Sequence, residues 1–239
     1  MSKHSEIHIR QTRLDPSQED LSAAEAWLSA DETRRAHSFR FAKDRRRFIQ
    51  RHAFLREVVA HYLKLPPAEV PLEIKQNKPP QVTGPASMTG LQLSMSSSDD
   101  QAVVSVAWHR RVGIDIERIR PEFEDTGIAK SFFSQAENAH LEALPAARMR
   151  LAFFRIWARK EAYVKAIGLG LSRDLASFDV ICPDDNLTPK DEALVNDRKV
   201  SGGHRPWLVR DVARVSGFAL ACCAEGNDWS ITYRSDAKA

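Results

Sequence analysis

The sequence has few of the features that stabilise small secreted domains or anchor a chain in a membrane. Its three cysteines, Cys182, Cys222 and Cys223, show neither a disulfide framework nor a metal-binding spacing, which favours buried thiols in a reducing compartment. No apolar run approaches the roughly 20 residues that span a bilayer. The opening stretch MSKHSEIHIRQTRLD is polar and lacks the apolar core of a signal peptide. We therefore expect a cytoplasmic protein that does not associate with membranes.

The motifs of several enzyme classes are also missing. The eight histidines show no HExxH spacing, and neither a G-x-S-x-G elbow nor a P-loop occurs. The net charge of +3 is small, yet nine lysines and arginines lie between Arg34 and Arg56, with Asp44 as the single acid there. Such a cluster binds phosphates or an acidic partner, or else forms a solvated basic helix face.

The hydrophobic pattern predicts a mixed α+β fold. Helical spacing of apolar residues predicts helices at 21–39, 44–65, 134–144 and 153–172. Short apolar runs predict strands at 70–74, 91–95, 102–108, 111–118, 178–181, 207–212, 218–224 and 229–233. Ser134 and Glu137 have the spacing of a capping box, and Asp31 is a candidate cap for a second helical segment within 21–39. One long helix followed by about three strands occurs twice, so we expect two similar α+β halves, residues 1–111 and 112–239.

The strand VGIDIER carries two acids on one face. Side chains alternate along a strand, so Val112, Ile114 and Ile116 point into a core while Asp115 and Glu117 point the other way. The two carboxylates then lie roughly 7 Å apart at the backbone. Such a pair of carboxylates either lies on the solvent-exposed face of an edge strand or belongs to a functional site.

The helix FFRIWARKEAYVKAI carries a second polar stripe. Trp157, Glu161 and Lys165 are spaced four apart, which describes either a surface ion pair or a half-buried functional stripe. If Glu161 packs over the acidic strand face, three carboxylates ~5 Å apart repel by about 3 kcal/mol per pair at an effective dielectric constant of 20. A proton or a cation is then required between them. Oxygen ligands of this kind suit Mg²⁺, and a flanking lysine suits the stabilisation of phosphate charge.

These two segments together have the pattern of a known signature. The chain contains VGIDIE and, about forty residues later, WARKEAYVK. This pair of segments resembles the signature of the surfactin-type 4'-phosphopantetheinyl transferases, and the segments FFSQAE, RHAFLR and NKP support the resemblance. The resemblance implies two pseudosymmetric α+β halves, each a long helix packed on a small antiparallel sheet, with the active site in the cleft between them. It implies Mg²⁺-dependent transfer of the phosphopantetheine arm of coenzyme A to a serine of an acyl or peptidyl carrier protein, which releases 3',5'-ADP. One chain with both halves suffices as a monomer.

The resemblance also implies roles for individual residues. Asp115, Glu117 and Glu161 match the Mg²⁺ ligands, and Glu161 also matches the base for the carrier serine. Lys165 matches a catalytic lysine beside the pyrophosphate. The residues implied for coenzyme A binding are Arg34, Arg35, His37, Lys78, Ser94, Met95, Asp115 and Lys165. Docking of the carrier is expected at the FFS segment and at the loop after Glu117, and a pI near 8.8 favours encounter with an acidic carrier.

The chain departs from the family pattern at two positions. Met95 stands where a histidine usually contacts a phosphate of coenzyme A, and methionine donates no hydrogen bond. Loss of one such contact weakens binding by about ten- to a hundredfold. Asn77 stands where glycine is common. A catalytically weak relative that binds coenzyme A or carrier protein without efficient transfer is therefore an alternative. A Mg²⁺-dependent nuclease is a further alternative, although no nucleic-acid motif occurs and we expect no nucleic-acid partner.

Overall fold

The fold combines helices with short strands. A computed structural model describes residues 5–15, 17–75, 78–122, 127–170, 173–181, 191–197, 205–212 and 215–234. The helices are α1 (Gln18–Glu25), α2 (Ala30–His37), α3 (Ala42–Leu63), α4 (Ile128–Phe132), α5 (Gln135–Ala143) and α6 (Ala146–Ile167). The strands are β1 (Glu6–Arg13), β2 (Leu72–Glu73), β3 (Gln81–Val82), β4 (Leu91–Ser98), β5 (Gln101–Trp108), β6 (Val112–Arg118), β7 (Phe178–Asp179), β8 (Glu192–Leu194), β9 (Asn196–Asp197), β10 (Trp207–Asp211), β11 (Phe218–Glu225) and β12 (Ser230–Tyr233). The predicted α+β class is confirmed.

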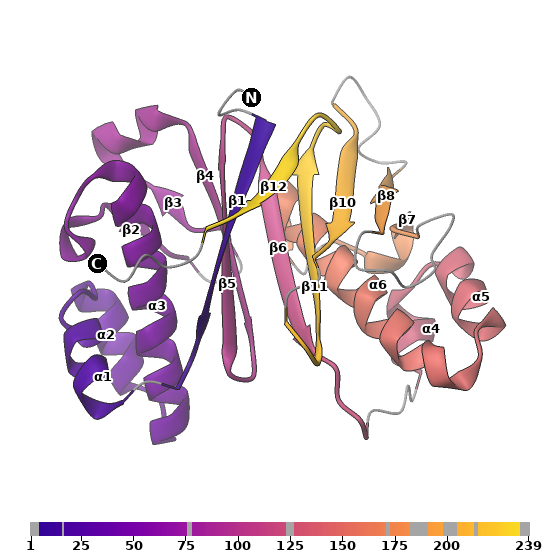
Figure 1. Cartoon of the computed structure of the whole chain (residues 1–239), viewed down its shortest axis with the longest axis horizontal. Helices are drawn as coiled ribbons and strands as arrows, with labels where there is room; N and C mark the ends of the chain where they lie inside the picture. The colour runs from indigo at the N-terminus through magenta and orange to yellow at the C-terminus, as the bar shows by residue number, and fades with distance from the viewer. Residues whose placement is uncertain are drawn as a thin grey trace.

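Two four-stranded sheets occupy the middle of the molecule, and helices cover their outer sides (Figure 1). One sheet has the strand order β12-β1-β5-β4, and α3 packs on it through a cluster that includes Leu55, Val58 and Val104. The other has the order β6-β11-β10-β8, and α6 packs on it through a cluster that includes Ala162 and Ala221. Each half therefore contains a long helix on a mainly antiparallel sheet, as expected.

A third apolar cluster joins the two sheets. It contains Ile9 and Val103 from one sheet and Ile114, Ile116 and Cys222 from the other, all buried. The predicted alternation in VGIDIER is confirmed, because its aliphatic residues point into this shared core. The opposite face of β6 packs against α6.

Helix ends follow their capping residues. Ser134 and Glu137 form the predicted capping box of α5, with each side chain accepting from the other's backbone N–H. The prediction of Asp31 as a cap was wrong, because Ser29 caps α2 through its own box with Glu32 and leaves Asp31 in the first turn. The expected second segment within 21–39 is α2, which begins at Ala30 after α1 has ended at Glu25.

The helix of the second signature is longer than its apolar stripe suggests. Helix α6 begins at Ala146 rather than Phe153, because Pro145 precedes a run of good helix formers. It ends at Ile167, where Gly168 adopts a left-handed conformation with φ of 73°. The glycine of the GLG segment therefore stops the helix just beyond Lys165.

The first strand was missed in the sequence. Strand β1 pairs antiparallel with β5 and parallel with β12. Its polar residues His8 and Arg10 are buried together with Ile7 and Ile9, so no clean alternation of apolar and polar residues marks it. The last strand thus joins the sheet of the first half. The division of the chain at residues 111 and 112 stays a prediction.

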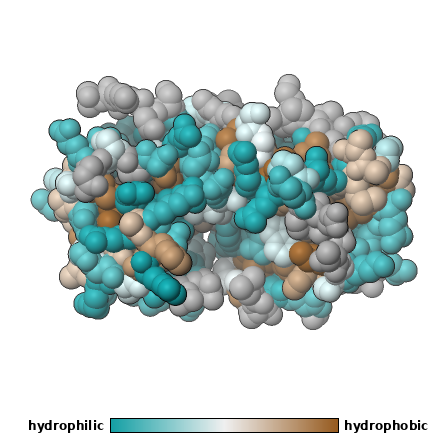
Figure 2. Space-filling model, turned by 90° about the horizontal axis from the view of Figure 1, so that it is seen from below, coloured by the Kyte–Doolittle hydropathy of each residue, from teal (hydrophilic) through white to brown (hydrophobic). Residues whose placement is uncertain are grey.

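Buried thiols lie in the centre of the second sheet. Cys222 and Cys223 are free and buried on β11, as expected, whereas Cys182 lies outside the described residues. In the part of the chain that the structure describes, no helix is long and apolar enough to cross a membrane. Hydrophilic residues predominate on the face shown in Figure 2, which is hollowed near its middle.

Candidate active site

A close approach between β6 and α6 creates the acidic site. A Cβ atom on Gly113 would lie 2.0 Å from the carbonyl oxygen of Ala162 and 2.5 Å from the backbone nitrogen of Ala166. Only glycine fits there, and its fit brings the helix down onto the strand. The polar stripe of α6 is thereby placed over the strand face that bears Asp115 and Glu117.

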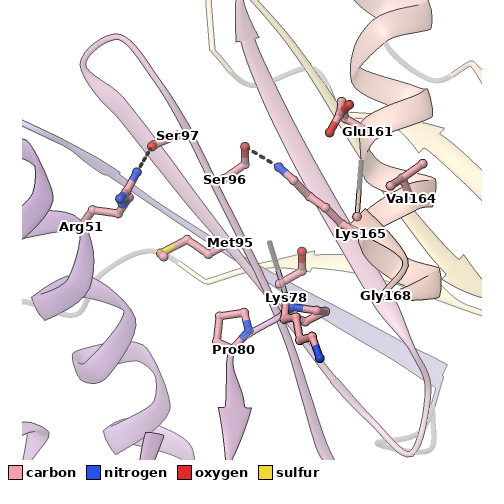
Figure 3. A pocket seen from close by; sticks show the side chains of 13 residues that line it. Arg51, Lys78, Pro80, Met95, Ser96, Ser97, Glu161, Val164, Lys165 and Gly168 are labelled. Atoms are coloured by element: carbon pink, nitrogen blue, oxygen red, sulfur yellow. Dashed lines mark hydrogen bonds between the residues drawn. The ribbon is translucent and has the colours of Figure 1, made fainter. Parts of the chain in front are cut away.

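The centre of the site is a bond between Lys165 and Asp115. The Lys165 ammonium lies 2.6 Å from Asp115 Oδ1 and 2.8 Å from Ser96 Oγ, and the Ser96 hydroxyl lies 2.8 Å from the same Asp115 oxygen. Asp115 is only 3% exposed, whereas Lys165 is half-buried. Figure 3 shows Lys165 reaching from α6 toward Ser96, with Glu161 one turn away on the same helix. Three elements, α6, β4 and β6, therefore meet at one charged group.

Serine side chains join the edges of the two sheets. Among the described residues no backbone ladder connects β4 to β6. Instead Ser94 Oγ accepts from the N–H of Ile114 at 3.1 Å, and Ser98 Oγ accepts from the N–H of Arg118 at 3.0 Å. The Ser98 hydroxyl also donates to Glu117 Oε2 at 3.1 Å. The two halves of the molecule thus meet along a row of hydroxyl groups on β4.

The carboxylates of the site are electrostatically strained. Burial, and then repulsion from Asp115, raises the pKa of Glu117 to about 7, against opposing contributions from Ser98 and Lys165. Burial and Asp115 also raise the pKa of Glu161, although Lys165 acts in the other direction. Asp115 Oδ2 and Glu161 Oε1 are buried without a hydrogen-bond partner among the described residues. Lys165 and the serines therefore supply too few donors and too little positive charge for all the acids of the site.

The donor set fits a hard divalent cation such as Mg²⁺. Asp115, Glu117 and Glu161 offer only oxygen atoms, and two of these oxygens are buried without a partner. Among the described residues, however, no three histidine, cysteine or acidic side chains are gathered closely enough to hold a metal ion by themselves. A cation there needs water or phosphate oxygens as further ligands, which is the usual arrangement for Mg²⁺.

Two neighbouring cavities lie on the first-half side of this acidic centre, and the first of them reaches Glu161 and Lys165. The first has a volume of about 450 Å³ and includes Glu161 and Lys165 in its walls, with Gly168 and Gly170 beside them. The second has about 490 Å³ and lies toward α2 and α3. The residues that line both are Arg51, Lys78, Pro80 and Met95. An elongated ligand can therefore extend from the acids on α6 to the basic helices of the first half.

The implied coenzyme A residues are distributed unevenly around these cavities. Lys78 and Met95 line both cavities, Ser94 and Lys165 line the first, and Arg35 lines the second. Exposed Arg34 pairs with Asp31, and His37 pairs with Glu25. Within the described residues, neither Arg34 nor His37 lines either cavity. Their roles stay predictions, as do those of the other implied residues, and Asn77 lies outside the described residues.

Some residues near the site have no individual role assigned from the sequence. Arg51 lies between the cavities, donates to Ser97 Oγ at 3.0 Å and has its pKa lowered by burial. Ser96 and Ser98 hold Asp115 and Glu117 by hydrogen bonds. The signal for the serines was available, because they occupy alternate positions on one strand face in LSMSSS.

Lys160 lies outside the site despite its place in the signature. Its ammonium is fully buried, 2.7 Å from Glu137 Oε2, and donates to the carbonyl oxygens of Leu175 and Phe178. Burial lowers the pKa of Lys160. The lysine therefore ties α6 to α5 and to the segment that follows α6, one residue away from Glu161.

Comparisons with known proteins give the family. Residues 111–223 match a family model described as the 4'-phosphopantetheinyl transferase superfamily, and residues 12–110 match one described as 4'-phosphopantetheinyl transferase, N-terminal. The chain is 34% identical over 228 residues to the 4'-phosphopantetheinyl transferase HetI of Nostoc, across 95% of this chain and 91% of that one. It is 24% identical to the 4'-phosphopantetheinyl transferase Sfp of Bacillus subtilis, across 89% of each chain.

A solved structure is a weaker match. The holo-(acyl-carrier-protein) synthase from Bacillus anthracis, solved in complex with CoA (3',5'-ADP), is 22% identical, with a TM-score of 0.39 over 48% of this chain and 96% of that one. The family models and the curated relatives together cover nearly the whole chain. The chain therefore belongs to the 4'-phosphopantetheinyl transferase superfamily and is an enzyme of that class.

Proposed function

We propose that this enzyme transfers the 4'-phosphopantetheine arm of coenzyme A to a serine of an acyl or peptidyl carrier protein, in the manner of the surfactin-type members of its family. The observation that carries the proposal is that the cavity beside Glu161 and Lys165 shares two basic residues, Arg51 and Lys78, with the second cavity. Glu161 and Lys165 lie at one end, and Arg51 and Lys78 lie between the cavities. An anionic donor with phosphates along its length fits this order of groups.

The basic residues bind the nucleotide end of the donor. Lys78 is exposed at the rim of both cavities, and Arg35 lines the outer one. Arg51 is held by Ser97 and by the face of the Phe48 ring, with its guanidinium carbon 5.7 Å from the ring centroid. A guanidinium fixed in this way is ready to contact phosphate before the ligand arrives.

The acidic end performs the transfer. The carrier serine oxygen attacks the β-phosphorus, the bond from that phosphorus to the bridging oxygen breaks, and 3',5'-ADP leaves. Glu161, whose side chain lines the first cavity, takes the serine proton. Lys165 offsets charge on the phosphate oxygens. Asp115, Glu117 and Glu161 would hold Mg²⁺, which would supply further positive charge for the transferred phosphate.

An aromatic surface beside the site suits carrier docking. Phe132 on α4 is 44% exposed, and its ring lies edge-on to Trp157 at 5.8 Å between centroids. Trp157 precedes Glu161 by one helical turn. The loop after Glu117 is described only to residue 122. Docking at Phe132 would bring the carrier serine toward the acidic end of the cavity. Because one chain supplies both walls, we expect a monomer, and its buried free thiols suit the cytoplasm.

Intact-mass spectrometry of an apo carrier protein tests the proposal. The carrier is incubated with the enzyme, coenzyme A and Mg²⁺, with a parallel sample in EDTA. We expect a metal-dependent mass gain of one phosphopantetheine arm. Coenzyme A binding without a mass gain across several carriers would favour the alternative of a catalytically weak relative, for which Met95 in both cavity walls is the supporting observation. If the enzyme neither binds coenzyme A nor adds mass to any carrier, the proposal is refuted.

A further inference from the structure

A lysine already supplies positive charge at the place where the acids need it. The Lys165 ammonium bonds Asp115 Oδ1 at 2.6 Å and Ser96 Oγ at 2.8 Å, distances typical of charge-assisted hydrogen bonds. The same Asp115 oxygen also accepts from the Ser96 hydroxyl. These three groups form a closed ring of hydrogen bonds. A divalent cation at this oxygen would compete with the ammonium, because two positive charges at bonding distance from one oxygen repel each other.

The ammonium satisfies only part of the site. Asp115 Oδ2 and Glu161 Oε1 remain buried without a hydrogen-bond partner among the described residues. A buried carboxylate oxygen in that condition costs free energy until a donor or a cation reaches it. The single positive charge of the ammonium therefore neutralises only part of the negative charge that the carboxylates of the site carry. The resting arrangement is stable enough to form, but it leaves two oxygens available to a stronger cation.

Lys165 has open space beside it on the side away from Asp115. It lies in the last turn of α6, its side chain is 29% exposed, and it lines the first cavity together with Arg51 and Lys78. Figure 3 shows its side chain crossing the space between α6 and β4. A flexible four-carbon stem lets the ammonium turn toward a phosphate group in that cavity without movement of the helix. Asp115 is fixed by its strand and lacks this freedom.

We propose that Lys165 is an exchangeable counterion that couples cation binding to substrate binding. In the resting enzyme it neutralises Asp115, and Ser96 is the positioning residue that holds it there from the other half of the molecule. When a pyrophosphate enters the cavity, the ammonium moves to the phosphate oxygens and releases Asp115 to the divalent cation. This inference rests on the proposed function. It predicts that coenzyme A and the cation each tighten the binding of the other by the same factor.

Direct measurement of Mn²⁺ binding tests the exchange without any turnover. Electron paramagnetic resonance of free Mn²⁺ gives the affinity of the metal-free enzyme and of the Lys165→Met and Lys165→Arg variants. We expect Lys165→Met to bind Mn²⁺ at least tenfold more tightly, because the competing charge beside Asp115 is gone. Lys165→Arg keeps that charge and should remain near wild type. Lys43→Met, an exposed residue on α3, removes the same charge at the surface and should change the affinity by less than twofold.

Addition of coenzyme A separates exchange from a simple change in local charge. Saturating coenzyme A should tighten Mn²⁺ binding to wild type by roughly fivefold or more, within the usual range of coupling between sites. It should have a much smaller effect on Lys165→Met, in which no ammonium remains to be released. Ser96→Ala removes the hydroxyl that bonds both partners, so its Mn²⁺ affinity should rise severalfold without coenzyme A. Circular dichroism and thermal unfolding of each variant show whether it folds.

The outcomes distinguish this inference from the proposed function. Equal Mn²⁺ affinity of wild type and folded Lys165→Met, or equal tightening of both by coenzyme A, would overturn the exchange and leave the transfer reaction standing. Mn²⁺ binding to none of the variants at millimolar concentration would overturn the cation site, and the exchange with it. Tighter Mn²⁺ binding by Lys165→Met together with no carrier modification by the wild-type enzyme would support the exchange while refuting the transfer.

Discussion

Replacement of Gly113 by alanine should move the helix that carries the proposed base. The new Cβ would lie 2.0 Å from the carbonyl oxygen of Ala162 and 2.5 Å from the nitrogen of Ala166, both of which are backbone atoms of α6. Real Cβ contacts do not fall below 3.0 Å, so the helix must retreat by roughly 1 Å. Gly113 has no positive φ, so alanine causes no backbone strain of its own. The whole effect is steric.

The displacement affects stability and activity by separate routes. Overpacking of a close contact between helix and sheet costs about 1–3 kcal/mol of unfolding free energy. Because Glu161 and Lys165 lie on the displaced helix while Asp115 lies on the strand, the bond of 2.6 Å between Lys165 and Asp115 lengthens. A misplacement of about 1 Å in a catalytic group lowers the rate by about a hundredfold. Activity should therefore fall much further than stability requires.

Two assays test this reasoning. Urea unfolding gives the stability of Gly113→Ala, and the carrier mass assay gives its rate at a temperature where the variant is folded. Gly84→Ala is the matched control, because Gly84 has φ of +62° but nothing within 4 Å of its added Cβ. That variant should lose about 1–2 kcal/mol through backbone strain and keep its turnover. A folded Gly113→Ala enzyme with more than half of the wild-type rate would refute the view that this glycine sets the position of α6.

Four other variants and conditions test different parts of the structure. Glu161→Gln should lower carrier modification by about 10²–10⁴-fold with an unchanged melting temperature, as measured by mass spectrometry and thermal unfolding; near-normal turnover would exclude it as the base. Met95→His should tighten coenzyme A binding about tenfold in calorimetry, because a donor is added in the wall of both cavities. Lys160→Met should cost about 3–5 kcal/mol in urea unfolding, since it leaves Glu137 as a fully buried unpaired charge, and Lys160→Met with Glu137→Leu should recover part of that loss. Stability should fall by about 3 kcal/mol between pH 4.5 and pH 2 through Glu32. Burial alone would raise the pKa of Glu32, but His52, Arg56 and Ser29 lower it to about 2, so the unfolded chain takes up the proton first; Glu32→Gln should flatten this part of the pH profile.

The elements of the fold were predictable where local signals agree. The capping box at Ser134 and the aliphatic alternation in β6 each depend on a few neighbouring residues, and the structure confirms both. Strand β1 was missed because two buried polar residues, His8 and Arg10, interrupt its alternation. His8 is accommodated by Tyr62 from α3, a partner 54 positions away that no local pattern reveals. Tertiary partners, rather than propensity, make that segment a strand.

The sequence predicts which charged residues share a face within β6 and within α6, but it does not predict that the two elements pack against each other. Spacing on β6 places Asp115 and Glu117 on one face, and spacing on α6 places Glu161 and Lys165 on one stripe. Each pattern by itself is equally consistent with a solvated surface. The deciding feature is Gly113, which admits the backbone of α6 against β6. A glycine in a strand signals close approach, but it does not say which element approaches.

The serine row on β4 shows why the rest of the site is hidden in the sequence. Ser94, Ser96 and Ser98 alternate on one strand face in the same way as the acids on β6, and alternation of polar residues ordinarily indicates a face turned to water. Here the two polar rows meet each other, because β4 and β6 lie edge to edge without a backbone ladder and the hydroxyls take the place of the missing main-chain bonds. A hydroxyl serves in that place because it both donates and accepts, so one serine bonds a carboxylate and a lysine at once. Replacement of all three serines by threonine would keep that capacity, whereas alanine would leave the N–H of Ile114 without its acceptor. The polar pattern that looks like surface is therefore what holds the two halves, and the charged groups between them, in register.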